Sequence, residues 1–219
     1  MKAAEKIRLA IEDGVSSGTL LPGDLINEAE LSMRYGVSRT PVREALLQLQ
    51  AQGMLTSLPR GGMVVAKMDV PQLLAMWELL AELEGLCARL ACERMTPDER
   101  AAIASIHAKG EAIVNSGDRE AWRISNMALH ETLYAGARNP YLHQEILHMR
   151  SRTGAYREHA FAAFGDIRSS WEQHSQVVDA IMRRDETAAC RAMVSHLSPG
   201  QGAKGFAAFV ASLPKELLG

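Results

Sequence analysis

Apolar residues recur with the 3.6-residue period of an amphipathic helix in the first part of the chain. Ile7, Ala10 and Ile11 share one face, which predicts a helix over residues 3–15. The following residues, 16–23, are rich in serine, glycine and proline, and they predict a loop that leads into a short extended segment.

Two helices joined by a tight turn are expected next. Asn27 can cap the first of them, and Glu30 lies at the reciprocal position of a capping box. Gly36 can adopt a positive φ and end that helix, after which Ser38 can cap a helix over residues 39–52. The pattern therefore predicts helix, turn and helix.

The helix over residues 39–52 has two different faces. Pro41 falls in its first turn, where a missing N–H is tolerated. The apolar face consists of Val42, Ala45, Leu46 and Leu49, and the other face carries Thr40, Arg43, Glu44 and Leu47. One face can pack into a core while the other contacts a partner.

A β-hairpin is expected after this helix. Residues 54–58 and 63–65 predict two short strands around the tip Pro59-Arg60-Gly61-Gly62. A helix-turn-helix followed by such a hairpin is typical of a winged helix-turn-helix, in which the later helix enters the major groove of DNA and the hairpin lies along the backbone. Residues 1–67 are therefore expected to bind DNA.

The sequence changes character from residue 68 onward, where Ala, Leu, Glu and Arg dominate and no strand-like alternation occurs. The expected helices cover residues 70–95, 97–115, 118–137, 140–163, 166–184 and 186–197, with a short closing helix near 206–212. The expected fold is mainly α: a winged helix-turn-helix at 1–67, a linker at 68–71, and an antiparallel all-helical bundle for effector binding and dimerisation at 72–219.

Composition indicates the kind of protein and its compartment, but it does not identify the function. The hydrophobic fraction of 47% and the charged fraction of 23% are those of an ordinary globular protein. The net charge is -2, and residues 1–67 hold 8 Lys and Arg against 7 Asp and Glu, so charge alone does not identify a DNA-binding protein. Cys87, Cys92 and Cys190 form no disulfide framework and are expected to be reduced packing residues. Without a leader or a membrane-length apolar run, a soluble cytoplasmic protein is expected.

The run Gly36-Val37-Ser38-Arg39-Thr40-Pro41-Val42-Arg43-Glu44-Ala45-Leu46, with Leu21-Pro22-Gly23 before it and Arg60-Gly61-Gly62 after it, closely resembles the GntR family of regulators. His130, the run Ala137-Arg138-Asn139-Pro140-Tyr141-Leu142, and the later His174 and His196 resemble the FCD effector domain of the FadR branch. The resemblance covers nearly the whole chain and implies a transcription regulator, most readily a repressor.

The resemblance implies DNA contacts from Ser38, Arg39, Thr40, Arg43 and Arg60. An arginine can bond guanine O6 and N7 in the major groove or hold a phosphate. Two arginines on an arbitrary helix would more often form a solvated face, but the turn, the cap and the wing favour DNA contact here. Because two-fold dimers bind operators with matching symmetry, a homodimer on an inverted repeat is expected.

The resemblance also implies a divalent metal, zinc or nickel, held by Asn126, His130, His174 and His196. Three imidazoles and one oxygen leave coordination positions for water or an acidic effector. The family's usual aspartate is Asn126 in this chain, and its neutral amide oxygen predicts weaker metal binding. A pocket in which the histidines are neutral hydrogen-bond donors remains an alternative. The other histidines, His107, His143, His148 and His159, are expected to be hydrogen-bonded or exposed helix residues.

A small carboxylate is the effector that such a domain implies, because a metal and nearby guanidinium groups make a cationic hole in an apolar bundle. Arg152 and Tyr156, four residues apart, are its expected partners, while Leu80 stands near a position where relatives often carry arginine. The three tryptophans, Trp77, Trp122 and Trp171, are expected to be structural.

Two other classes of function stay open on the sequence. Three histidines with an open metal position could activate water, which would make the chain a metal-dependent hydrolytic enzyme with an accessory winged domain. A DNA-binding architectural protein without a ligand is the second. The regulator hypothesis is favoured, because the most specific motif in the chain belongs to DNA recognition.

Overall fold

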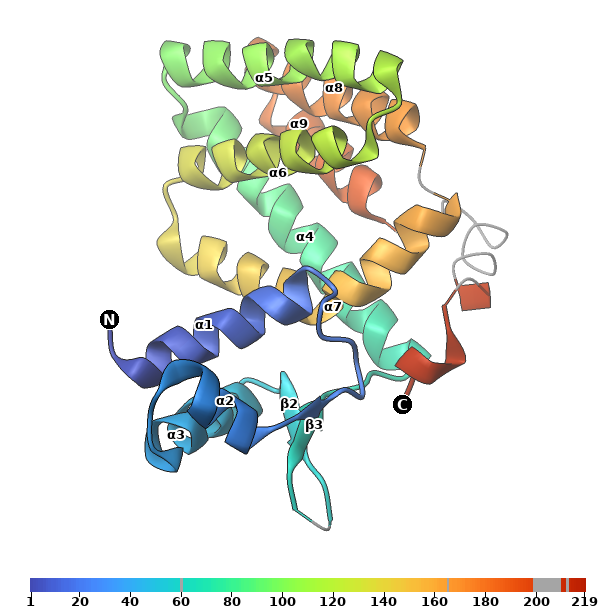
Figure 1. Cartoon of the computed structure of the whole chain (residues 1–219). Coiled ribbons are helices and arrows are strands. Elements are labelled where there is room, and N and C mark those ends of the chain that lie inside the picture. The colour runs from blue at the N-terminus through green and yellow to red at the C-terminus, as the bar shows by residue number, and fades with distance from the viewer. Residues whose placement is uncertain (60, 165, 199–209, 212) are drawn as a thin grey trace. The chain divides into compact units, whose positions relative to one another are not determined.

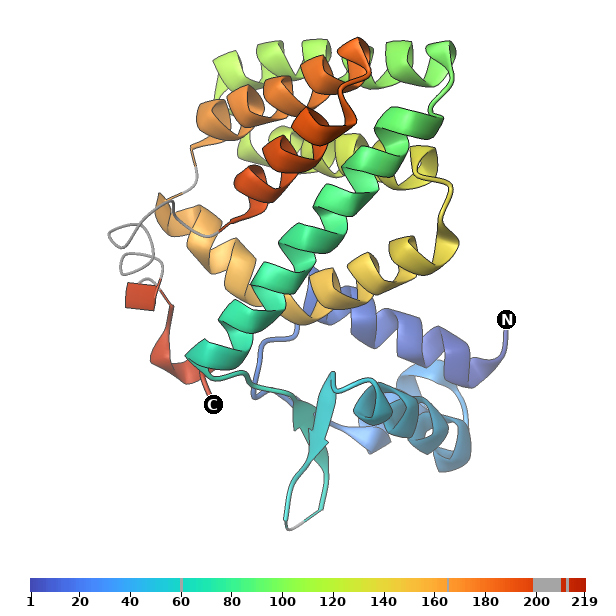
Figure 2. The same cartoon turned by 180° about the vertical axis from the view of Figure 1, so that it is seen from behind.

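The computed structural model describes residues 1–59, 61–164, 166–198, 210–211 and 213–219, and it describes no side chains over 158–164. These residues form two compact units, whose elements can be followed from both sides in Figures 1 and 2. The first unit comprises residues 1–74, 150–160 and 210–219, and the second comprises 75–149 and 161–209, as far as these ranges are described.

Three helices build the first unit: α1 (Ala3–Ser16), α2 (Glu28–Tyr35) and α3 (Arg39–Ala51). Both α1 and α2 pack against α3 (Figure 1). The apolar stripe predicted on α3 is fully buried, and it shares a core with Ile7 and Ile11 of α1. The amphipathic pattern therefore predicted correctly which face of α3 is buried.

Asn27 and Gly36 bound α2 as predicted, but in the described residues Glu30 does not complete a capping box and Ser38 makes no side-chain cap. Asn27 Oδ1 accepts from the backbone N–H groups two and three residues on, at 3.0 and 3.3 Å, and Gly36 ends α2 with φ 63°. Ser38 occupies the N-cap position of α3, but its side chain makes no capping hydrogen bond, so that prediction is wrong. The reason is local: the third helical residue is Pro41, which lacks the N–H that a capping serine often binds.

A small antiparallel sheet completes the winged helix-turn-helix. Its strands are β1 (Leu25–Ile26), β2 (Leu55–Ser57) and β3 (Met63–Val65), in the order β1-β3-β2. The predicted hairpin is confirmed as β2 and β3, and the short extended segment after residue 23 is β1. The hairpin projects from the helices as a wing (Figure 1).

Residues 150–160 of helix α7 (Pro140–Phe164) and the last residues of the chain also belong to the first unit. A Cβ added to Gly154 would lie 2.9 Å from Ser16 O, so glycine permits the close approach of α7 to the end of α1. At the C-terminus, a short 3-10 helix η1 (Lys215–Leu217) is followed by Leu218, which forms a parallel bridge with Met68.

The regular secondary structure in the described residues of the second unit is all helical. Together with most of α4 (Val70–Arg94) and parts of α7, it contains α5 (Pro97–Ser116), α6 (Arg119–Gly136), α8 (Ile167–Arg183) and α9 (Glu186–Leu197). Helix α5 packs on α6 and α8, and α8 packs on α9 (Figure 2). The six long helices that the sequence predicts are all present, while residues 206–209 and 212 of the predicted closing helix lie outside the described residues.

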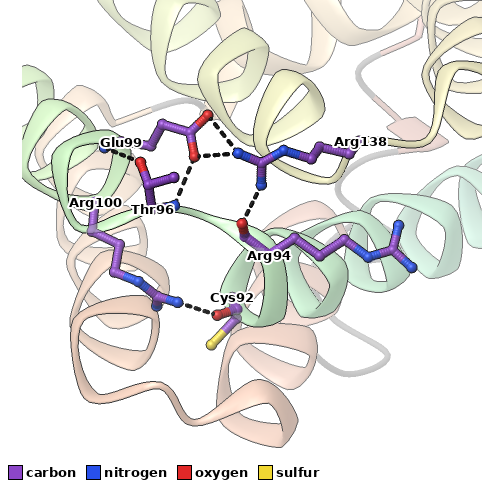
Figure 3. A network of polar contacts seen from close by, with 6 residues as sticks. All are labelled: Cys92, Arg94, Thr96, Glu99, Arg100 and Arg138. Carbon is purple, nitrogen blue, oxygen red and sulfur yellow. Dashed lines mark hydrogen bonds and ion pairs between the residues drawn. The ribbon is translucent and has the colours of Figure 1, made fainter.

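A network of hydrogen bonds fixes the corner where α4 turns into α5 (Figure 3). Thr96 and Glu99 form a capping box at the start of α5, and Glu99 also pairs with Arg138 at 2.9 Å. The hydrogen bond from the Thr96 backbone and those from Arg138 lower the pKa of the Glu99 carboxyl. The charges of Glu99 and Arg138 at this corner are therefore exposed and paired with each other.

Beneath this corner, Arg100 is only 6% exposed. Its guanidinium donates to Ile181 O of α8 at 2.6 Å. It also donates to Cys92 O of α4 at 2.7 Å (Figure 3). Both carbonyls lie near helix C-termini, where the backbone carries partial negative charge. Burial raises the pKa of the Cys92 thiol, in keeping with the packing role expected for this cysteine.

None of the helices in the described residues is long and apolar enough to span a membrane.

Candidate functional site

The exposed face of α3 presents the residues predicted to contact DNA. Ser38, Arg39, Thr40 and Arg43 are all exposed at the N-terminal half of the helix. Arg39 and Arg43 are four residues apart and therefore share a face. Unpaired N–H groups in the first turn of a helix favour an anion such as phosphate, and the guanidinium groups add positive charge beside them.

Arg43 is already engaged by a carboxylate within the unit. Its Nε donates to Glu28 Oε2 of α2 at 3.0 Å, and the Arg43 side chain remains 61% exposed. The pair links the two helices of the helix-turn-helix, and it leaves most of the guanidinium open to a ligand. No local sequence pattern pointed to Glu28, which lies 15 residues away from Arg43 along the chain.

The wing closes through backbone hydrogen bonds at its tip. Leu58 N–H donates to Gly62 O, and Gly61 N–H donates to Leu58 O, both at 3.0 Å. Gly61 and Gly62 have φ of 89° and 91°, a conformation that favours glycine. Arg60 itself lies outside the described residues, so its DNA contact stays a prediction.

Three histidines from three helices of the second unit come together. His130 of α6, His174 of α8 and His196 of α9 each offer a ring nitrogen, and these three atoms lie within 4.8 Å of one another. His174 Nε2 and His196 Nε2 are 3.0 Å apart, and His130 and His174 are each 1% exposed. The three residues that the sequence singled out thus form one cluster, hereafter the histidine cluster, in which His130 and His174 are buried and His196 is half-buried.

The histidine cluster has neighbours that hold its rings in place. Glu84 Oε2 of α4 lies 2.9 Å from His130 Nδ1, and Gln173 Oε1 lies 2.8 Å from His196 Nδ1. Trp122 stacks on the His174 ring with centroids 5.7 Å apart. These contacts fix ring orientation, and they were not predicted from the sequence, although a glutamate in the apolar stripe of α4 is a signal that could have been used.

The remaining sequence predictions for this unit concern Asn126 and the other histidines. Asn126 is half-buried on α6, one turn before His130 on the same helix. His107 Nε2 is 2.8 Å from Ser175 Oγ and its ring stacks on Trp171, and burial lowers its pKa. His107 is therefore a packed, hydrogen-bonded residue as expected, whereas the side chain of His159 lies outside the described residues.

Arg152 and Tyr156, the predicted effector ligands, belong to the first unit rather than to the unit that holds the histidine cluster. Tyr156 is fully buried: its hydroxyl accepts from Met68 N–H and donates to Leu217 O, both at 2.9 Å. Burial lowers the pKa of Arg152 and raises that of Tyr156. The structure thus does not group this pair with the histidines, and their contact with an effector stays a prediction.

Replacing Tyr156 with phenylalanine is expected to destabilise the protein by about 1–3 kcal/mol, because two buried backbone groups lose their partner. Chemical denaturation of the full chain with far-UV detection measures the change. Tyr141→Phe is the matched control, since Tyr141 is 80% exposed, and its effect should be within about 0.5 kcal/mol. Equal midpoints for the two variants would contradict the role given to the Tyr156 hydroxyl.

Two family models match the chain. Residues 3–65 match the bacterial regulatory proteins of the gntR family, and residues 75–199 match the FCD domain. The chain belongs to the GntR family. It is 31% identical over 209 residues to the HTH-type transcriptional regulator YieP of Escherichia coli (strain K12), covering 86% of this chain and 88% of the relative.

Further relatives of this GntR-family regulator agree in fold and class. The galactonate operon transcriptional repressor of Escherichia coli (strain K12) is 28% identical, over 90% of this chain and 95% of the relative. The solved structure of E. coli McbR/YncC superposes with a TM-score of 0.76 at 24% identity, covering 90% of this chain and 94% of that one. The relatives are named as transcription regulators, which places this chain among regulators with an FCD effector-binding domain and not among enzymes.

Proposed function

We propose that this GntR-family regulator is a repressor that binds an inverted-repeat operator as a homodimer. The proposed DNA contacts are made by Ser38, Arg39, Thr40, Arg43 and Arg60. The exposed N-terminal half of α3 supports the assignment, because it offers two arginine forks and free backbone N–H groups on a face that the core leaves open. Because its DNA target lies in the cytoplasm, the regulator acts there.

The second part of the proposal is a divalent metal, zinc or nickel, bound by the histidine cluster with the amide oxygen of Asn126 as a further ligand. The observation that carries it is the convergence of three ring nitrogens within 4.8 Å. Two nitrogen ligands of one zinc ion are about 3.3 Å apart, given Zn–N bonds of about 2.0–2.1 Å and a tetrahedral angle. The 3.0 Å between His174 Nε2 and His196 Nε2 is close to that separation, so this pair of nitrogens fits the ion.

A small carboxylate is the proposed effector of this site. A bound divalent ion would supply a positive centre with an open position, to which a carboxylate oxygen can bind. The protein itself excludes water through the buried His130, His174 and Trp122, and it holds the rings of His130 and His196 through their Nδ1 atoms. One relative is the repressor of the galactonate operon, and galactonate is a carboxylate.

Regulation would follow from linkage between the effector and DNA. An effector that favours one arrangement of the dimer changes operator affinity, and DNA must then change effector affinity by the same factor. The coupling free energy between two such sites is typically about 1–3 kcal/mol. The coupling therefore predicts the same fold-change in two titrations: operator affinity with and without effector, and effector affinity with and without operator DNA.

One set of measurements tests the proposed function. Protein purified without chelator is analysed for zinc and nickel and for its mass in solution, and DNA selected from a random library is sequenced for inverted repeats. The proposal requires metal close to one per chain, a dimer, and an enriched palindrome. A metal-free monomer that selects no sequence would contradict all three parts, and each part can also fail alone.

Replacing Asn126 with aspartate is expected to tighten zinc binding by at least about tenfold, because a charged oxygen ligand replaces a neutral one beside a dication. Competition with a chromophoric chelator measures the affinity. Asn115→Asp is the matched control: Asn115 lies on α5 and accepts from Arg168 at 2.7 Å, and it is not part of the proposed site. If Asn126→Asp changed zinc affinity no more than Asn115→Asp, Asn126 would not be a ligand.

A further inference from the structure

Glu84 is a carboxylate in the middle of an apolar helix face. It lies on α4 between Leu80 and Ala88, one turn away on either side, both of which are fully buried. Glu84 itself is 1% exposed, and its side chain is completely buried. A charge in such surroundings is costly unless a partner compensates it, so its position calls for an explanation beyond packing.

The partner of Glu84 is a member of the histidine cluster. Glu84 Oε2 lies 2.9 Å from His130 Nδ1. His130 in turn belongs to the histidine cluster with His174 and His196. A carboxylate at one ring nitrogen selects the tautomer with a proton there and leaves the other nitrogen unprotonated. Contact at Nδ1 therefore assigns Nε2 of His130 to the ligand position.

Gln173 makes the corresponding contact on a second ring. Its Oε1 can only accept a hydrogen bond, so His196 Nδ1, 2.8 Å away, must donate. This leaves His196 Nε2 as the unprotonated nitrogen, and that atom lies 3.0 Å from His174 Nε2. Two of the three rings are thus held at Nδ1 from outside the cluster with Nε2 directed into it.

We propose that Glu84 is a positioning residue for the metal site and supplies the negative charge that Asn126 lacks. The inference rests on the metal binding proposed above. Glu84 holds His130 in the tautomer that binds metal through Nε2, and its charge acts on the ion through the imidazole. The site therefore keeps one carboxylate although position 126 is neutral. The negative charge lies on Glu84, which contacts the ligand His130, and not on a direct ligand at position 126.

The test compares zinc affinity of the full-length wild-type protein and Glu84→Gln by chelator competition. The substitution keeps the shape of the side chain and removes its charge. Loss of an outer partner of a metal-bound histidine weakens binding about 10–100-fold, and this is the expected result. Glu78→Gln is the matched control, because Glu78 lies on the same helix and is exposed, and its zinc affinity should equal that of wild type.

A second measurement separates positioning from a purely structural role. Long-range ¹H–¹⁵N NMR spectra of the metal-free protein report which nitrogen of His130 carries the proton: Nδ1 is expected in wild type, with a mixture of tautomers in Glu84→Gln. If Glu84→Gln does not fold, Glu84→Asp keeps the charge but shortens its reach, and weaker zinc binding with a shifted tautomer is expected there.

The outcomes distinguish this inference from the proposed metal site. Equal zinc affinity in wild type and folded Glu84→Gln overturns the positioning role while the metal site stands. A wild-type His130 with its proton on Nε2 overturns it as well. If wild type takes up no zinc, the metal site fails first and the inference fails with it.

Discussion

Replacing Arg43 with alanine should weaken specific operator binding by about 1–3 kcal/mol, the cost of losing a good base contact. In the structure the Arg43 guanidinium is exposed and pairs with Glu28, and an exposed pair of this kind contributes about 0.2–1 kcal/mol. DNA can therefore displace Glu28 at small cost. Fluorescence anisotropy with the selected operator and with a scrambled duplex at fixed salt measures the specific part of the affinity.

Arg43→Lys is the control that separates base recognition from phosphate binding. Lysine keeps the charge but lacks the planar fork that bonds two acceptors of guanine at once. If Arg43 recognises a base, Arg43→Lys should lose specificity nearly as far as Arg43→Ala. If it binds phosphate, Arg43→Lys should keep most of the affinity, and Arg43→Ala should lower the salt dependence by about one unit of slope. Unchanged operator affinity in Arg43→Ala would rule out either contact.

Glu28→Gln completes the comparison. Removing this carboxylate frees Arg43 and takes a negative charge away from the proposed DNA face, so operator affinity should rise by a few-fold. A fall would mean that Glu28 instead orients Arg43 for binding, which would change the role of the pair but not the contact of Arg43 with DNA.

His174→Gln should have the largest effect on metal binding. His174 is a central member of the histidine cluster, close to His196 and stacked on Trp122, and its ring offers one of the proposed ligands. Loss of a direct ligand should cost more than the 10–100-fold typical of an outer partner. Thermal unfolding with and without zinc gives a second readout, since ligand at 100 times its Kd stabilises a protein by about 2.7 kcal/mol.

His107→Gln is the matched control for this prediction. His107 is a half-buried histidine of the same unit, bonded to Ser175 and stacked on Trp171, and it is not among the clustered ligand atoms. His107→Gln should unfold at a somewhat lower temperature but keep the full stabilisation by zinc. If His174→Gln also kept it, the histidine cluster would be a hydrogen-bonded core feature and the metal proposal would be wrong.

The sequence by itself determined the local elements and the residues with a specific chemical pattern. The winged helix-turn-helix and the six long helices could be predicted closely because their signals are local. These signals are helical periodicity, the glycine at position 36, and the proline and glycines at the tip of the wing. Three of the seven histidines stood out because the resemblance to the FCD domain pointed to them. The prediction of Ser38 as a cap was wrong, because it overlooked that Pro41 removes the N–H at the position a cap would bind.

Only the tertiary structure decided which distant groups meet. Glu84 and His130 are 46 positions apart on two different helices, so no local sequence pattern joins them. Their contact nevertheless places a buried charge next to the proposed metal site. The pairing of Arg43 with Glu28, and the grouping of Tyr156 with Met68 and Leu217, have the same origin. Periodicity shows which face of a helix is buried, but the partner on that face depends on how separate helices pack, and this is a property of the whole fold.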